Sequence, residues 1–226
     1  MNTKKIKPTI ISFILDRSGS MEAMKKYVID GFNEYINGLK MSKETKKTLF
    51  SLTTFDSVGM DRPYIATPIK KVEPLTNKTF IPRGGTPLYD AAVDTIESLA
   101  DKVADDQPTL VVIMTDGAEN SSQKHDQECF SDLVEKLKLK GNWTFVFMGA
   151  NQDSWGNAQK LGYSQGAVQD FAFNSEGIKS AFSSLRGASI NYVSQMNTSQ
   201  LNFGKGSKWK MNSNENFFDG GDKNES

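Results

Sequence analysis

A short apolar run near the start of the chain ends abruptly in a carboxylate, and this junction most constrains the fold. Residues 10–15 are apolar except for one serine, and Asp16, Ser18 and Ser20 follow at alternate positions. The run is too short to cross a membrane, but it has the length of a strand that is buried on both faces. Such a strand would deliver the polar side chains to the carboxyl edge of an open α/β sheet, where these sheets bind ligands.

Two further segments have the same character. Residues 110–115 form a second apolar run, and Asp116 and a glycine follow it. Between the two runs, a Gly84-Gly85 pair precedes Thr86, and Pro87 stands where a helix would begin. Carboxylate and hydroxyl oxygens are the ligands that hard divalent cations such as Mg²⁺ prefer. The three segments therefore predict one metal site with five oxygen-bearing residues: Asp16, Ser18, Ser20, Thr86 and Asp116.

Helix capping is the alternative interpretation of the same residues. Asp and Ser are favoured N-cap residues, and helices are expected after both apolar runs. Capping explains any one of the five residues as well as metal binding does. It does not explain why all five stand at the ends or turns of three separate segments, so we favour the metal site.

The rest of the chain alternates between expected strands and amphipathic helices. Strands are expected at 9–15, 48–55, 63–72, 109–115, 143–148 and 167–171, and helices at 21–39, 87–104, 127–140, 154–161 and 175–194. Pro63 and Pro68 fit only a strand at the edge of a sheet, and Gly38 is expected to end the first helix. The alternation predicts an α/β fold with a doubly wound, mostly parallel central sheet and helices on both faces.

The composition is that of an ordinary soluble protein. The chain has 226 residues, of which 37% are hydrophobic, enough to bury one core. Lys and Arg together number 27, as do Asp and Glu, so the overall charge favours neither nucleic acid nor a membrane as a partner. The single cysteine, Cys129, cannot form an internal disulfide, and the first apolar run lacks the length of a signal sequence, so we expect a cytoplasmic location.

The last part of the chain differs in character from the rest. Residues 196–226 are rich in Asn, Ser, Gly and Lys and show no helical or strand periodicity. Such a composition does not bury enough apolar surface to offset the entropy of ordering. We therefore expect one domain at 1–195 followed by a polar, disordered tail at 196–226.

The three segments resemble the metal-ion-dependent adhesion site (MIDAS) of the von Willebrand factor A (vWA) family. Asp16, Ser18 and Ser20 match the family's Asp-x-Ser-x-Ser motif, and Thr86 and Asp116 match its further Thr and Asp. The resemblance covers residues 8–190 and implies a vWA fold with one antiparallel edge strand. It also implies that the Ser and Thr hydroxyls contact the cation directly, while the two Asp side chains act through bound water.

Within the family, residues 72–76 and 82–91 are similar to small stand-alone bacterial or phage proteins of the tellurite-resistance-associated type. This resemblance implies a role inside the cell, in a stress- or defence-related complex, with an AAA-type ATPase as one class of partner. The cation, Mg²⁺ or alternatively Mn²⁺ or Ca²⁺, would capture an Asp or Glu side chain of a partner protein. The sequence does not define the oligomeric state.

Two other functions stay open beside this binding module. A metal-dependent phosphohydrolase would use the cation to activate water, but the only histidine, His125, lies in a polar loop, and a Cys129–His125 pair has no further support. A structural subunit with a vestigial site would not respond to metal at all. We expect a binding module and not an enzyme.

Charged and polar residues on the same rim are candidates for setting specificity. Arg17 and Arg83 would steer an acidic partner to the metal, or they are solvated loop charges. Glu119 and Asn120 follow Asp116, and Asp56 ends the second expected strand.

Overall fold

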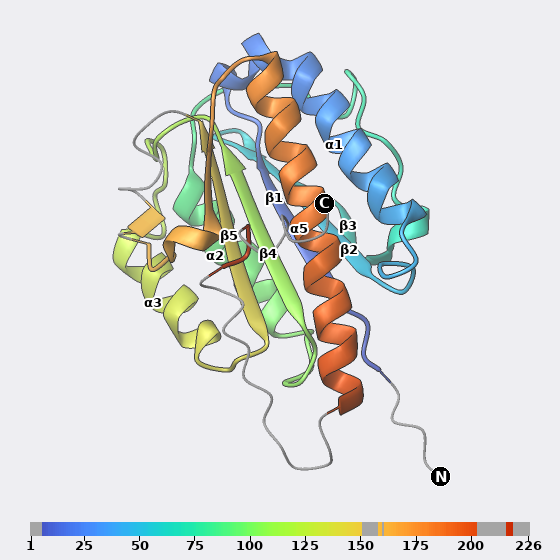
Figure 1. Cartoon of the computed structure of the whole chain (residues 1–226). Helices are drawn as coiled ribbons and strands as arrows, with labels where there is room; N and C mark the ends of the chain where they lie inside the picture. Colours follow the sequence, from blue (N-terminus) through green and yellow to red (C-terminus); the bar gives the residue numbers. More distant parts are fainter. Residues whose placement is uncertain (1–5, 151–157, 160, 203–215, 219–226) are drawn as a thin grey trace.

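The computed structural model places six strands in one sheet between two layers of helices (Figure 1). It describes residues 6–150, 158–159, 161–202 and 216–218. The strand order is β3-β2-β1-β4-β5-β6. The strands are β1 (Ile10–Asp16), β2 (Leu49–Asp56), β3 (Gly59–Pro68), β4 (Thr109–Thr115), β5 (Trp143–Ala150) and β6 (Val168–Phe171).

The pairing of the strands confirms the expected fold class. Strand β1 pairs in parallel with β2 and β4, and β5 pairs in parallel with β4 and β6. Strand β3 pairs with β2 in the antiparallel direction and lies at the edge of the sheet. The chain therefore has a doubly wound, mostly parallel sheet with one antiparallel edge strand.

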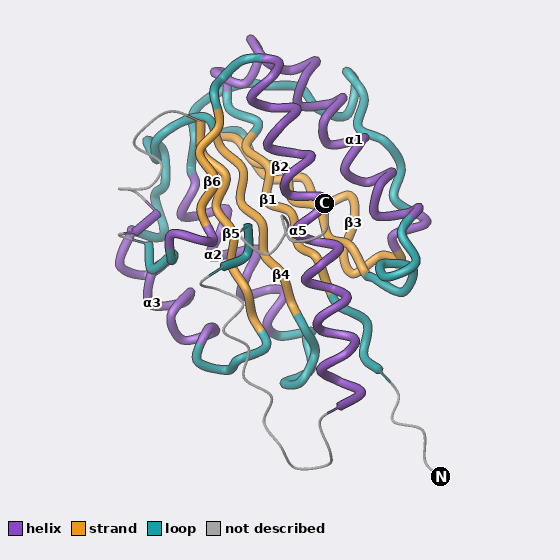
Figure 2. Tube along the Cα trace, viewed as in Figure 1, coloured by secondary structure: helices purple, strands orange, loops and turns teal. Residues whose placement is uncertain are grey.

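Helices cover both faces of the sheet and enclose two apolar cores. Helices α1 (Lys25–Met41) and α5 (Ser175–Asn202) run side by side on one face, and α2 (Leu88–Ala100) and α3 (Gln127–Lys138) lie on the other (Figure 2). Side chains of β1 alternate between the cores: Phe13 packs toward α1 and α5, and Ile14 packs toward α2. Because both faces are covered, β1, β4 and β5 are buried along their whole length, as their apolar runs predict.

The first helix differs from its prediction at both ends. A 3-10 helix, η1 (Gly19–Met24), precedes α1, and α1 continues through Gly38 to Met41. The expectation that Gly38 ends the helix was therefore wrong. A Cβ atom at Gly38 would overlap the side chain of Arg186 on α5, so this glycine allows close helix packing.

The edge strand is displaced from its predicted position. It was expected at 63–72 but runs from Gly59 to Pro68, where η2 (Ile69–Lys71) follows it. Two register shifts interrupt its pairing with β2, and Ala66 has a positive φ of 45°. Bulges and prolines of this kind make an edge strand a poor template for pairing with another chain.

Two predictions fall largely on residues that the structure does not describe. The short helix expected at 154–161 is described only at 158–159. Of the expected tail at 196–226, residues 196–202 continue helix α5 beyond its predicted end near 194, and Phe217 is buried with its ring 6.1 Å from that of Tyr192. The remainder of the tail, 203–215 and 219–226, lies outside the described residues, and its disorder stays a prediction.

Hydropathy along the helices gives one further result. Within the described residues, every helix is too short or too polar to cross a membrane.

Alanine at Gly31 is expected to lower the free energy of unfolding by about 1–3 kcal/mol, although alanine favours helices. A Cβ atom there would overlap the ring of Phe182, which stacks on Phe13 in the core. Gly187→Ala is the matched control, because a Cβ at Gly187 of α5 meets no atom within 4 Å. That change should stabilise the protein by about 0.5–1 kcal/mol. Urea unfolding of both variants measures the difference, and two equally stable variants would contradict the close packing.

Candidate metal centre

The predicted metal-site residues lie together at the carboxyl edge of the central strands. Strand β1 ends at Asp16, and Asp116 directly follows β4. The two strands are parallel neighbours with Leu15 opposite Met114, so their ends meet at the same edge. This edge is the upper end of the sheet in Figure 1.

Hydroxyl groups connect the two strand ends. The Oγ atoms of Ser18 and Ser20 are 3.1 Å apart, and the Ser20 hydroxyl donates to Asp116 Oδ1 at 2.8 Å. Thr86 approaches from the start of α2: a Cβ atom built on Gly117 would lie 3.7 Å from Thr86 Oγ1 and 4.0 Å from Ser20 Oγ. The Thr86 and Ser20 hydroxyls therefore border the same small space beside Asp116.

Asp16 stands behind these hydroxyls and is fully buried. Its Oδ1 accepts from the Ser18 backbone N–H at 2.7 Å, and its Oδ2 accepts from the Thr115 hydroxyl at 2.6 Å. Sequence reasoning missed Thr115, which it counted as the last residue of the apolar run 110–115. Through these two contacts Asp16 fixes the turn that carries Ser18.

Capping does not account for this arrangement. Ser18 occupies the N-cap position of η1, but its side chain makes no capping hydrogen bond. Asp16 binds the turn and Asp116 binds Ser20, whereas the next helix, α3, is capped by Asp126, which accepts from the Cys129 N–H at 2.9 Å. The hydroxyl of Ser18 is buried and contacts Ser20 instead of capping the helix.

The oxygen positions fit a hard cation. Adjacent ligands of an octahedral Mg²⁺ ion with bonds of about 2.0–2.1 Å lie about 2.9 Å apart. The spacing of 3.1 Å between the Oγ atoms of Ser18 and Ser20 is close to this value. Among the described residues no three His, Cys, Asp or Glu side chains form a group that could hold a metal ion. A cation at this edge would therefore rest largely on hydroxyl oxygens.

Burial disfavours the charged form of both carboxylates. It raises the pKa of the Asp16 carboxyl to about 6, despite the hydrogen bonds from Thr115 and Ser18, and Asp116 adds repulsion. Burial likewise raises the pKa of Asp116, which the hydrogen bond from Ser20 partly offsets. A bound cation would favour the charged form of both groups.

Asparagine at position 16 is expected to stabilise the metal-free protein at neutral pH. Folding raises the pKa of Asp16 from 3.8 to about 6, so this group favours the fold below pH 3.8 and loses that effect as pH rises through about 6. The uncharged amide of Asp16→Asn avoids the loss, which is on the order of 1–3 kcal/mol above the folded pKa. Thermal unfolding of both proteins in EDTA, at a series of pH values across this range, measures it.

Magnesium should reverse the order of thermal stability, so that the unchanged protein melts at a higher temperature than Asp16→Asn. The reason is that metal sites need the deprotonated carboxylate. Equal melting temperatures of Asp16→Asn and the unchanged protein in EDTA at pH 8 would contradict the buried charge.

The loop that carries Thr86 is held by its neighbours on both sides. The Gly84 carbonyl accepts from the Gly19 N–H at 2.9 Å, and the Gly85 carbonyl accepts from the Ser57 N–H at 3.0 Å. Gly84 has a φ of 65°, which favours glycine. Asn120 accepts from the Thr86 N–H at 2.8 Å through Oδ1, so Asn120 positions Thr86.

The remaining rim residues have structural roles that the sequence did not reveal. Glu119 accepts from the backbone N–H groups of Ser121 at 2.7 Å, Ser122 at 2.6 Å and Tyr89 at 3.0 Å. It thereby ties the loop after β4 to the first turn of α2. Sequence reasoning had listed Glu119 and Asn120 only as candidates for setting specificity.

Arg17 is not a solvated loop charge. Its side chain is buried and forms ion pairs with Asp56, at 2.8 Å, and with Asp61. Arg83, which is about half exposed, donates to the same Asp56 oxygen at 3.0 Å. Burial alone would raise the pKa of Asp56, but the backbone N–H of Val58 and the guanidinium groups of Arg83 and Arg17 hold it below its usual range.

His125 and Cys129 are brought together but do not form an activated nucleophile. Cys129 Sγ lies 3.5 Å from His125 Nδ1, and His125 Nε2 lies 3.2 Å from Asp94 Oδ1. Burial and the carboxylates of Asp126, Glu97 and Asp132 raise the pKa of the Cys129 thiol. The nucleophile in cysteine chemistry is the thiolate, which this environment disfavours.

Comparisons with known proteins identify the fold. A scan against protein-family models found no match, and a search of curated proteins found no relative. Among solved structures, proximal thread matrix protein 1 from the mussel byssus, with a zinc-occupied MIDAS motif, has 16% identity and a TM-score of 0.58. The match covers 82% of this chain and 46% of that chain, so this chain spans less than half of the mussel protein.

Two further solved structures have a similar fold. The SpRpn10 VWA domain has 13% identity and a TM-score of 0.54, covering 79% of this chain and 95% of that domain. The manganese-loaded TRAP protein of Plasmodium vivax has 20% identity and a TM-score of 0.52, and the match covers 78% of this chain and 73% of that chain. At these identities the likeness shows the fold alone, and this chain has the fold of a vWA domain.

Proposed function

We propose that this chain of vWA fold is a metal-dependent protein-binding module. The cation would be held by the hydroxyls of Ser18, Ser20 and Thr86, with Asp16 and Asp116 anchoring bound water. The observation that carries this proposal is the continuous contact from Ser18 through Ser20 to Asp116 at an edge of the sheet where Ser20 is exposed.

The chemistry of this donor set favours capture of a carboxylate. Neutral hydroxyls leave most of the charge of a divalent ion uncompensated, and hard cations keep exchangeable water ligands. An Asp or Glu side chain of a partner protein would replace one such water and gain a strong charge-assisted contact. Mg²⁺ is the cation that we propose, with Mn²⁺ and Ca²⁺ as alternatives.

Related folds support a divalent ion at this place. The MIDAS motif of the mussel byssus protein holds zinc, and the Plasmodium vivax TRAP protein holds manganese. By the resemblance noted in the sequence, we propose a bacterial or phage protein that works in the cytoplasm, in a stress- or defence-related complex that includes an AAA-type ATPase.

A hydrolase is the weaker alternative. The ring of His125, the only histidine, contacts Asp94 at the side of α2. The backbone N–H of His125 donates to Asp90 at 2.8 Å. In the part of the chain that the structure describes, we identify as bases at the candidate centre only the two carboxylates that would hold the metal. A structural subunit with a vestigial site is the remaining alternative, and it predicts binding that ignores metal.

The test is affinity capture from a lysate of the native host, with Mg²⁺ and again with EDTA. We expect a partner that is retained only with metal and is lost when Thr86→Ala replaces the unchanged protein. Thr198→Ala is the matched control, because Thr198 is exposed near the C-terminal end of α5, and that end lies opposite the metal edge of the sheet in Figure 1. Equal recovery of every protein with and without metal, or by Thr86→Ala, would overturn the proposal.

A further inference from the structure

A second cavity lies directly beside the candidate metal centre. It has a volume of about 530 Å³ and lies between strand β3 and the segment 73–83. Arg17 and Arg83 line it on the side of the metal loop, and Arg17 stands between Asp16 and Ser18 in the chain. The cavity and the metal centre therefore share one loop, whose alternate residues face the two sites.

Arg17, which lines the cavity, has one hydrogen-bond donor that is not used. Its Nε donates to Asp56 at 2.8 Å, and its Nη1 pairs with Asp61. Its Nη2 is buried and has no hydrogen-bond partner among the described residues, and only 5% of the side chain is exposed. A buried donor without an acceptor is costly, and the two ion pairs keep this one in place.

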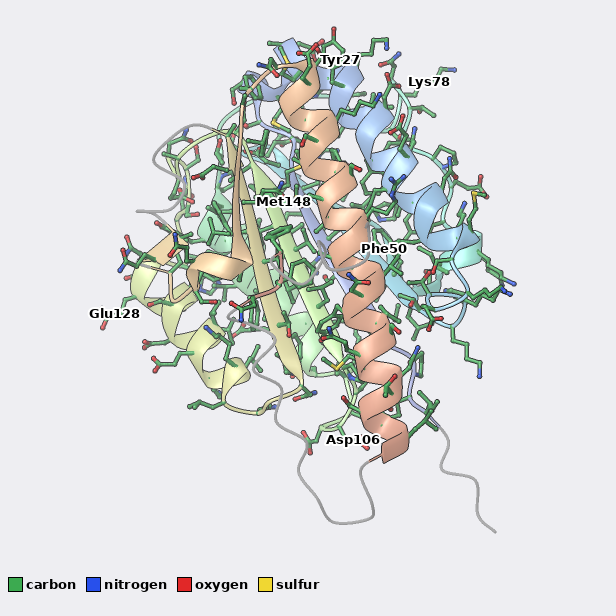
Figure 3. The ribbon with its side chains drawn as sticks, viewed as in Figure 1. Tyr27, Phe50, Lys78, Asp106, Glu128 and Met148 are labelled. Carbon is green, nitrogen blue, oxygen red and sulfur yellow. The ribbon has the colours of Figure 1, made fainter. Side chains whose placement is uncertain are left out.

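Four cationic side chains and two carboxylates, Asp61 and Glu73, line the cavity. Lys78 and Arg62 line it, and neither forms an ion pair with another residue in the part of the chain that the structure describes. Lys78 projects at the end of the molecule that also carries Tyr27 at the start of α1 (Figure 3). This is the end where the metal centre lies.

Apolar side chains form another part of the wall. Leu52 lies on the β2 side, and Leu75 and Ile81 come from the segment 73–83. Tyr64 stands opposite on β3, and its hydroxyl accepts from the Glu73 N–H at 3.0 Å. An apolar wall with a few convergent cationic donors suits an anion on a short hydrocarbon stem.

We propose that this cavity is a second docking site, which takes a glutamate side chain of the same partner segment whose acidic residue binds the metal. The inference rests on the proposed function, because it assigns the partner a pair of acidic residues. The stem of the glutamate packs against Leu75 and Ile81, and its carboxylate lies near Lys78 and Arg17.

The first experiment uses glycine–serine peptides that carry one glutamate, or two glutamates separated by one, two or three residues. In Mg²⁺ at low salt, fluorescence anisotropy should show at least about tenfold tighter binding of one of the two-glutamate peptides than of the one-glutamate peptide. The reason is that the second glutamate adds a charge-assisted hydrogen bond. Lys78→Gln should remove most of this ratio. Lys70→Gln, an exposed lysine outside the cavity, should preserve it.

The two proposals fail in different ways. If the one-glutamate peptide binds only with metal but no second glutamate improves binding, the cavity inference is wrong and the metal function stands. If the one-glutamate peptide ignores metal, the proposed function is wrong, and the cavity is then judged by a second measurement.

That measurement is a titration with sodium propionate in EDTA, followed by the NMR signals of the Arg17 Nε–Hε group and the Tyr64 ring. Propionate reproduces the end of a glutamate side chain, so we expect both signals to move with saturation, and to move less in Lys78→Gln. Unmoved signals would overturn the inference. A shift with inorganic phosphate and none with propionate would also overturn it, because it would assign the cavity to phosphate groups.

Discussion

Ser20→Ala is expected to weaken Mg²⁺ binding by at least about 10–100-fold, the range seen when even an indirect partner of a metal ligand is lost. The Ser20 hydroxyl joins Ser18 Oγ to Asp116 Oδ1, so its removal separates the two halves of the candidate centre. It also removes the hydrogen bond that lowers the pKa of the buried Asp116 carboxyl. Isothermal titration calorimetry with Mg²⁺ and Mn²⁺ measures the change in affinity.

The fold should survive this substitution, because Ser20 is exposed. Ser98→Ala serves as the control: Ser98 lies near the end of α2, where it only accepts from Lys102 at 3.4 Å. Unchanged Mg²⁺ affinity in Ser20→Ala would remove Ser20 from the metal site.

The largest loss of stability is expected for Asp56→Ala, at about 3–5 kcal/mol. The Asp56 side chain is fully buried, and its Oδ2 accepts from Arg17 Nε and Arg83 Nε. Its Oδ1 accepts from the Val58 N–H at 2.7 Å and the Gly59 N–H at 3.1 Å, which shape the turn into β3. Alanine leaves the buried Arg17 guanidinium without its main counter-charge. Chemical denaturation of the variant and the unchanged protein gives the difference in unfolding free energy.

Asp61→Ala is the matched control for Asp56→Ala. Asp61 also pairs with Arg17, but 65% of its side chain is exposed, so its loss should cost no more than about 1 kcal/mol. The pH dependence follows from the sign of the shift. Because folding lowers the pKa of Asp56 below 3.8, its contribution is complete above that value and is lost as pH falls further. Equal losses for the two variants would contradict a special role of the buried carboxylate.

The strands of the sheet were predictable because burial leaves a strong mark on sequence. Strand β4 runs Thr109–Thr115, as its apolar run predicts, and β1 and β5 differ from expectation by two residues or fewer at each end. Polar residues directly after β1 and β4 gave the edge at which Asp16 and Asp116 meet. Parallel neighbours bring such ends together wherever the strands pair, so no side-chain detail was needed.

Features that depend on packing partners were not predictable. Gly38 has the same residue type as a helix end, and only the position of Arg186 on α5 explains why the helix continues. Arg17 looked like a loop charge because its partners, Asp56 and Asp61, follow at distances of 39 and 44 residues. The hydroxyl of Thr115 was hidden for the same reason, since its acceptor is 99 residues away.

The seam between α1 and α5 has a mechanical consequence. Phe182 and Arg186 lie over Gly31 and Gly38, two turns or about 10 Å apart along α1. Each side chain lies where a Cβ atom would otherwise be, so α5 packs closely against α1 at two points. If α5 slid along its own axis, both side chains would press against the neighbouring turns of α1. A displacement of this last helix along the domain would therefore first require the Phe182 ring to leave its place over Gly31.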